Sequence, residues 1–84
     1  MAAVARICAA VKAPVNVLVA GPYAKNTLAE FAAAGVARLS LGSSLARVTH
    51  AAIRDAANGM FGAGDFTTLS SAMSGDAVDK LLTR

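Results

Sequence analysis

The stretch PVNVLVAGPYAKNTLAEFAAAGVARLSLGSSLA, residues 14–46, decides the fold that this chain can adopt. Its segment VNVLVA, residues 15–20, is apolar except at Asn16, which is typical of a parallel strand covered on both faces. The valine content and the proline and glycine at its boundaries favour a strand over a buried helix. A second short run, VARLSL over residues 36–41, predicts another strand.

A helix is predicted between these two strands. Thr27 and Glu30 have the spacing of a capping box, in which each side chain accepts a hydrogen bond from the other residue's backbone amide. Gly35 follows the apolar face of this segment and is a natural residue for ending a helix. Two parallel strands joined by a helix need a crossover connection, so the stretch predicts one β-α-β unit.

Helices are predicted on both sides of this unit. Apolar residues recur at three- and four-residue intervals over residues 2–11, and an amphipathic pattern covers residues 44–58. The glycine-rich segment 59–64 predicts a turn that ends the second of these helices. Two short helices follow, one over residues 65–73 and one capped by Asp76. The order helix–strand–helix–strand–helix followed by two short helices indicates an α/β fold, and no third strand is predicted.

The composition is more apolar than a domain of this size can bury. The chain has 84 residues, of which 56% are hydrophobic and 15% charged, and its mean hydropathy is +0.55. A domain this short buries only roughly 60% of its unfolded surface. We therefore expect either that the chain is part of a larger core or that it self-associates, and we predict a homo-oligomer rather than a folded monomer.

Charge and cysteine usage argue against several functional classes. The formal net charge is +3, the basic residues are scattered, and aromatic residues make up 5% of the chain, which argues against nucleic-acid binding. Cys8 has no second cysteine to pair with, and the sequence contains no Cys/His set for zinc. No apolar run reaches the length of a membrane span, and the N-terminus lacks the pattern of a signal peptide. We expect a cytoplasmic protein with no membrane partner.

The candidate binding residues follow the predicted strands. Gly42, Ser43 and Ser44 combine a glycine, two hydroxyls and the free amides of a helix N-terminus, which can bind an anion such as phosphate. An ordinary helix cap explains the same residues equally well. Asn16 is the one polar residue of its strand and can bind a substrate carboxylate if it faces the interior of a barrel. Its amide can instead be satisfied by a neighbouring strand.

No catalytic group is predicted in this chain. Its acidic residues fit helix caps or solvated faces, and no pair of carboxylates or nucleophile with a base can be assembled. His50 is the one histidine and lies on the polar side of the predicted helix 44–58, where a solvated side chain is expected. No metal ligands are predicted either.

The segments ICAAVKAPVNVLVAGP and TLAEFAAAGVARLSLGSSLARVTHAAIRDA resemble the C-terminal quarter of the phosphoenolpyruvate mutase / isocitrate lyase superfamily. They are most similar to bacterial members described as carboxyvinyl-carboxyphosphonate phosphorylmutase-like or 2-methylisocitrate lyase-like. The similar region runs from Val4 to Leu69. The resemblance rests on APVNVLVAGP, LAEFAAAGVARLSLG and the SSLAR helix that follows, none of which is a catalytic signature.

The resemblance implies a β/α (TIM-type) barrel, of which residues 1–84 would form a single partial domain: the last two β/α units and the C-terminal helices. Family members use Mg²⁺ to cleave or form C–C or P–C bonds in small 2-oxo or hydroxy acids. Their magnesium ligands and catalytic loop lie in earlier strands, so a C-terminal fragment or truncated form would bind no Mg²⁺ itself and would be inactive alone. Relatives often exchange the last barrel helix between subunits. Methylisocitrate lyases have a carboxylate-binding Asn on the seventh strand; Asn16 lies two residues before that position, which Leu18 occupies.

Two other interpretations remain open. The chain can be the phosphate-binding quarter of a different β/α-barrel enzyme. This interpretation is suggested by Gly42–Ser44, which lie at the start of a helix. It can also be a self-associating structural module without a ligand. The catalytic acids encoded upstream of Met1 would distinguish the first alternative, and a titration with phosphate or small dicarboxylates would test the second.

Overall fold

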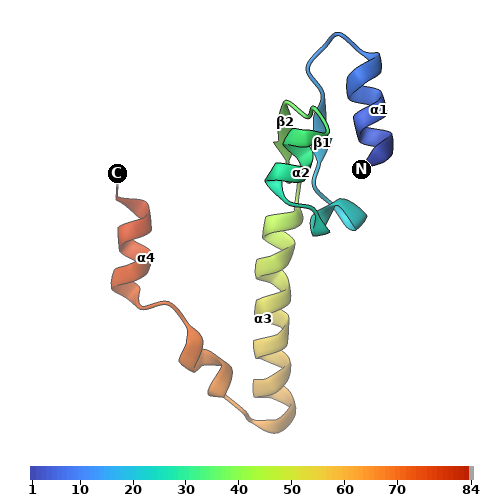
Figure 1. Ribbon diagram of the computed structural model, residues 1–84. Helices are drawn as coiled ribbons and strands as arrows, with labels where there is room; N and C mark the ends of the chain where they lie inside the picture. Colours follow the sequence, from blue (N-terminus) through green and yellow to red (C-terminus); the bar gives the residue numbers. More distant parts are fainter. Residues whose placement is uncertain (84) are drawn as a thin grey trace. The chain divides into compact units, whose positions relative to one another are not determined.

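The computed structural model describes residues 1–83, which divide into two compact units, residues 1–47 and residues 48 onward. We describe each unit by itself. The first contains two α-helices, two strands and a 3-10 helix, and the long helix α3 begins at its end (Figure 1). In chain order these elements are α1 (Ala2–Ala10), β1 (Asn16–Leu18), the 3-10 helix Gly21–Lys25, α2 (Leu28–Ala33), β2 (Arg38–Ser40) and α3 (Ser44–Ala63).

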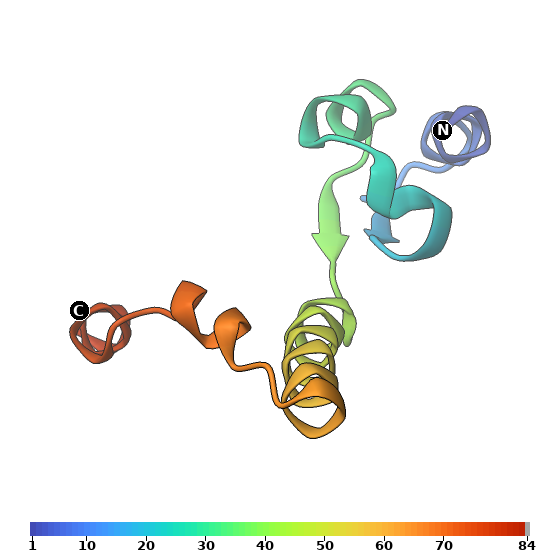
Figure 2. The same cartoon turned by 90° about the horizontal axis from the view of Figure 1, so that it is seen from below.

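The two strands form a parallel pair, as the sequence predicts. They lie side by side in Figures 1 and 2, with Asn16 opposite Arg38 and Leu18 opposite Ser40. Each strand has three residues, fewer than predicted, because each pairs on one edge only and has a short hydrogen-bond ladder. The ladder is extended by the amide of Val19, which donates to the Ser40 carbonyl at 2.8 Å. The structure therefore contains the β-α-β unit.

Local hydrogen bonds define α2. The Thr27 amide donates to the Glu30 carboxylate at 2.6 Å, and the Glu30 amide donates to the Thr27 hydroxyl at 3.3 Å, so the predicted capping box is confirmed. Gly35 follows the helix with φ +89°, and a Cβ there would meet the Cβ of Cys8 at 3.2 Å. This close approach places the end of α2 against α1. The buried core consists of Val4, 6% exposed on α1, and Phe31, 2% exposed on α2.

The two faces of the sheet differ in exposure. Val17 and Leu39 are half-buried, whereas Leu18 on the opposite face is 52% exposed. The expectation that the strands are covered on both faces is therefore wrong for the chain as it stands. Two short helices supply cover for one face only, since the crossover helix of a β-α-β unit lies on a single side. We call the exposed side the open face, and its residues are Asn16, Leu18, Arg38 and Ser40.

In the second unit, α3 continues further than the sequence predicts. The helix runs to Ala63 through Gly59 and Gly62, so the prediction that the glycine-rich segment ends it near residue 59 is wrong. A glycine inside a helix costs only about 1 kcal/mol relative to alanine, which a long helix tolerates. The helix ends where the backbone turns left-handed, at Gly64 with φ +64°. The amide of Asp65 then donates to the Gly59 carbonyl at 3.0 Å.

The C-terminal segments also differ from the prediction. A 3-10 helix, Thr67–Ser71, replaces the predicted helix over residues 65–73, because the Asp65 carboxylate accepts from the amide and hydroxyl of Thr67 and forms a turn. Helix α4 (Gly75–Leu82) is capped by Ser74, which accepts from the Ala77 amide at 3.1 Å, and not by Asp76 as predicted. Asp76 instead lies in the first turn, where the helix dipole favours it. No residue from 48 to 83 is fully buried.

Candidate functional site

The turn between β2 and α3 carries three of the four predicted binding residues. Gly42 has φ +55°, the left-handed conformation that favours glycine, and a Cβ there would meet the Leu18 side chain at 3.2 Å. The Ser44 hydroxyl donates to the Val19 carbonyl at 3.3 Å. The hydrogen bond of Ser44 therefore holds the turn against the carboxyl end of the neighbouring strand β1, where Gly42 passes close to the Leu18 side chain.

This arrangement brings the N-terminus of α3 to the carboxyl edge of the parallel pair. The Arg47 amide donates to the Ser43 carbonyl at 2.9 Å, which starts the helix directly after the turn. Gly42 and Ser43 are exposed, and Ser44 is half-buried. Ligands of parallel α/β folds bind at the carboxyl edge, and the N-terminal amides of a helix favour an anion. The turn has the position that an anion site requires, although the amide and the hydroxyl of Ser44 already donate to the Leu41 and Val19 carbonyls.

Asn16 lies apart from this turn. It is the first residue of β1, at the opposite end of the strand from Val19, and it is exposed on the open face. Its side-chain oxygen accepts a hydrogen bond of 2.9 Å from the Ser40 hydroxyl. The structure thus joins Asn16 to Ser40 and not to the predicted residues of the turn.

The sequence interpretation missed Ser40 and Arg38. Both lie on the open face with Asn16, because Arg38 is in register with Asn16 and Ser40 is two residues further along β2. The signal was the alternation in VARLSL, where the two polar residues occupy one face of the strand. Only the register between the strands shows that this face is the one that carries Asn16.

The acidic side chains with a shifted pKa stabilise turns. The Thr27 amide, followed by the Thr27 hydroxyl and the Asn26 side chain, lowers the pKa of Glu30. The amide and hydroxyl of Thr67 lower the pKa of Asp65 in the same way. Hydrogen bonds to the charged form stabilise it, so both carboxylates stay ionised in their capping roles. Neither has the raised pKa expected of a general acid.

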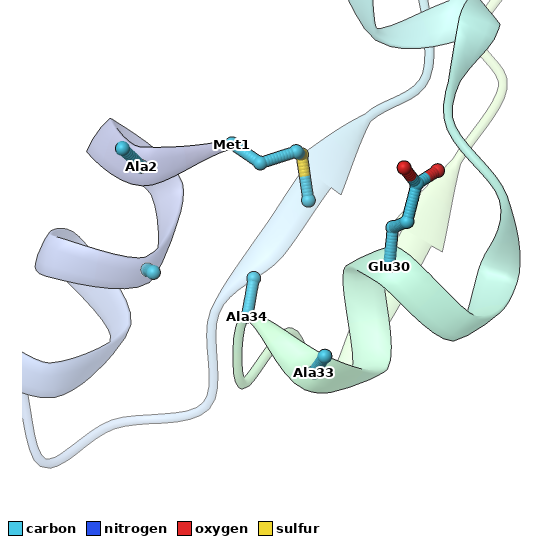
Figure 3. A pocket seen from close by; sticks show the side chains of 6 residues that line it. Met1, Ala2, Glu30, Ala33 and Ala34 are labelled. Carbon is cyan, nitrogen blue, oxygen red and sulfur yellow. The ribbon is translucent and has the colours of Figure 1, made fainter.

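Two shallow depressions lie on the helices of the first unit. One is on α1; the other lies between α1 and α2, where the Glu30 carboxylate points away from the alanine side chains (Figure 3). Their linings are Ala3, Arg6, Ile7 and Ala10 for the first, and Met1, Ala2, Ala5, Glu30, Ala33 and Ala34 for the second. Neither depression includes Asn16 or the turn Gly42–Ser44.

Among residues 1–83, no three His, Cys, Asp or Glu side chains come together as a metal site. Helices of the length and apolarity needed to span a membrane are also missing from the described part of the chain.

The comparisons with known proteins agree with the fold. The model of the phosphoenolpyruvate phosphomutase family matches residues 1–61. A protein from Burkholderia cenocepacia J2315, described as a lyase/mutase, has a crystal structure that matches 96% of this chain with a TM-score of 0.85 and 36% sequence identity. No curated protein matches the chain.

The parallel β-α-β unit and its carboxyl-edge turn define a piece of an α/β lyase/mutase fold. The chain belongs to the phosphoenolpyruvate phosphomutase family, and the resemblance inferred from the sequence is confirmed. It spans 29% of the length of the Burkholderia protein that it matches. The helix-rich α/β structure with its small parallel sheet therefore matches one part of the lyase/mutase fold.

Proposed function

We propose that residues 1–84 are a single partial domain, the last two β/α units and the C-terminal helices of a β/α (TIM-type) barrel. The parallel pair supports this proposal, because a β-α-β unit flanked by α1 and α3 is the repeating element of such a barrel. The open face would then be the interior of the barrel, which other strands would complete. The 29% coverage of the Burkholderia protein is consistent with a quarter of a barrel.

The complete enzyme would be a lyase or mutase of the phosphoenolpyruvate mutase / isocitrate lyase type. Such an enzyme uses Mg²⁺ to make or break a C–C or P–C bond in a small 2-oxo or hydroxy acid. The described residues do not fit a magnesium site, since the carboxylates of Glu30 and Asp65 are engaged in local hydrogen bonds and no cluster of acids exists among residues 1–83. In this proposal Mg²⁺ is held elsewhere in the barrel, and this chain is inactive alone.

The role of this chain is to bind the substrate. The turn Gly42–Ser44 would hold a phosphate or carboxylate with the N-terminal amides of α3, and Asn16 would donate to a substrate carboxylate. The observation that carries this assignment is the hydrogen bond from the Ser44 hydroxyl to the Val19 carbonyl, which holds the turn at the carboxyl end of β1. A cap that served the helix alone would not need this contact with the neighbouring strand.

A lyase assay tests the proposal. We expect no turnover of 2-methylisocitrate or oxaloacetate by this chain with Mg²⁺, and turnover when the coding region upstream of Met1 supplies magnesium-binding acids. Turnover by this chain alone would refute the assignment of catalysis to other segments. Upstream sequence with the acids of a different barrel enzyme would favour the alternative of a phosphate-binding quarter from another family.

The second candidate is a self-associating structural module without a ligand, which the exposed apolar side chains favour. Titration with inorganic phosphate, followed by amide chemical shifts, separates the two candidates. Saturable shifts confined to residues 42–45 would support the binding function. Unchanged shifts would support the structural module.

A further inference from the structure

Helix α3 contains an asparagine that is followed directly by a glycine, Asn58 and then Gly59. A glycine has no Cβ, so its backbone nitrogen is less hindered than that of any other residue. This nitrogen can therefore reach the side-chain carbonyl carbon of the asparagine before it. The other two asparagines of the chain, Asn16 and Asn26, are followed by the β-branched residues valine and threonine, which crowd the same approach.

The surroundings of Asn58 favour local opening of the helix. Asn58 is exposed, and no residue from 48 to 83 is fully buried, so few packing contacts hold the last turns of α3 in place. Gly59 and Gly62 lie in these turns, and a glycine destabilises a helix relative to alanine. Beyond the helix, the Asp65 amide donates to the Gly59 carbonyl at 3.0 Å and closes the end of α3 with one further hydrogen bond.

We propose that Asn58 is a site of spontaneous deamidation and that opening of the last turns of α3 controls its rate. The Gly59 nitrogen forms a bond to the side-chain carbonyl carbon of Asn58. The bond from that carbon to the side-chain nitrogen breaks, and ammonia leaves with the proton of the Gly59 amide. Water then opens the resulting succinimide ring at either of its carbonyl groups, which gives aspartate or isoaspartate. Water is the only co-reactant, so neither an oxidant nor an enzyme is required.

The folded helix opposes this reaction. Ring closure turns the backbone of Asn58 away from helical dihedral angles and removes the hydrogen of the Gly59 amide, which belongs to the hydrogen-bond ladder of α3. The reaction therefore takes place in the fraction of molecules in which residues 58–63 are open. This site is separate from the turn Gly42–Ser44, so the inference does not depend on the proposed function.

Deamidation weakens the part of α3 in which it occurs. A carboxylate at position 58 lies three residues after Asp55 on the same face of the helix, and like charges at this spacing destabilise a helix. Isoaspartate has a larger effect, because it adds a methylene group to the backbone and interrupts the hydrogen-bond ladder. Each modified molecule therefore opens the end of α3 more readily than an unmodified one.

Incubation of the full chain in mildly alkaline buffer, followed by tryptic digestion and mass spectrometry, tests the site. Cleavage after lysine and arginine places the three asparagines in three different peptides, so Asn16 and Asn26 are internal controls. We expect a mass increase of about one dalton, together with isoaspartate, in the peptide that contains Asn58. The other two peptides should keep their masses. An unmodified Asn58, or equal modification of all three asparagines, would overturn the proposal.

Two substitutions that leave Asn58 and Gly59 in place test the role of the helix. Gly62→Ala raises the helix propensity of the last turns and should slow deamidation up to roughly fivefold. Gly64→Ala places alanine at φ +64° and should accelerate it. In urea both variants and the original chain should react at the same rate, because the sequence around Asn58 is unchanged. Equal rates for the three proteins in native buffer would overturn the proposal.

Discussion

Glu30 and Asp65 show how a single side chain organises the backbone around it. Each carboxylate accepts hydrogen bonds from the backbone amide and the hydroxyl of one threonine. The threonine is Thr27 for Glu30 and Thr67 for Asp65. Both groups are exposed, so these bonds compete with water, but their geometry fixes the start of α2 and the turn after α3. The lowered pKa of each carboxylate is the electrostatic consequence.

The lowered pKa values predict an acid-dependent loss of stability. Since the folded form lowers the pKa of Glu30 below its ordinary value of 4.5, its contribution is fully present above that pH and is lost as the pH falls through the lowered value. Asp65, with an ordinary value of 3.8, behaves in the same sense at lower pH. Urea unfolding followed by circular dichroism should show the loss. The double variant Glu30→Gln, Asp65→Asn should reduce the dependence, and an unchanged dependence would contradict this assignment.

Gly42 is a second position where one residue determines the local structure. Gly42→Ala should destabilise the turn by about 1–2 kcal/mol, because alanine in the left-handed region carries that cost. The added Cβ would also press on the Leu18 side chain at 3.2 Å. Amide exchange at Ser44 and Val19 should accelerate. Ser43→Ala is the control, since residue 43 keeps its ordinary conformation and the variant should affect anion binding more than stability.

Among the elements, α3 is the longest helix of the described residues, and it continues through two glycines. It has 20 residues and contains Gly59 and Gly62 inside its last turns. These glycines weaken the C-terminal end of the helix without ending it, because the missing side chains cost conformational entropy and not hydrogen bonds. The helix ends only at Gly64, where φ is positive.

Gly62→Ala should therefore stabilise α3 by up to about 1 kcal/mol. Its Cβ would meet nothing within 4 Å, so no steric cost offsets the gain. The matched control is Gly64→Ala, which also has open space but a φ of +64° and should destabilise the end of the helix. Helicity measured by circular dichroism, with amide exchange over residues 58–63, distinguishes these outcomes. Equal effects of the two substitutions would show that α3 does not extend to Ala63.

At the scale of the whole molecule, the chain leaves most of its apolar side chains in contact with solvent. Val4 and Phe31 are its buried core, while Phe61 is 90% and Leu82 80% exposed. The parallel pair also has two unpaired edges, whose amides and carbonyls no helix can satisfy. The apolar surface that the chain buries is far smaller than the surface that an independent domain needs to bury.

We therefore predict that the isolated chain is not a folded monomer and that it forms a homo-oligomer. Several copies can pair their strand edges or exchange α3, and this would bury the exposed apolar surface. Sedimentation equilibrium at micromolar concentration measures the mass directly. A compact monomer of 8.4 kDa with cooperative unfolding would contradict the prediction and weaken the partial-barrel proposal.

The sequence by itself determined the features that depend on neighbouring residues. The capping box of α2, the end of that helix at Gly35 and the β-α-β order follow from hydrogen bonds and apolar spacing within a few residues, and these are present in any context. The turn Gly42–Ser44 was located for the same reason, and its role in binding stays a prediction.

Only the tertiary structure decided what depends on contacts between distant segments. The register of β1 and β2 joins Asn16 to Ser40 and places Arg38 opposite, although 24 residues separate the hydrogen-bonded pair. The exposure of Leu18 likewise depends on which elements cover the sheet, and an apolar run is the same whether its faces are covered or open. The physical reason is that strand pairing and burial are properties of two or more segments together, which the pattern of one segment does not contain.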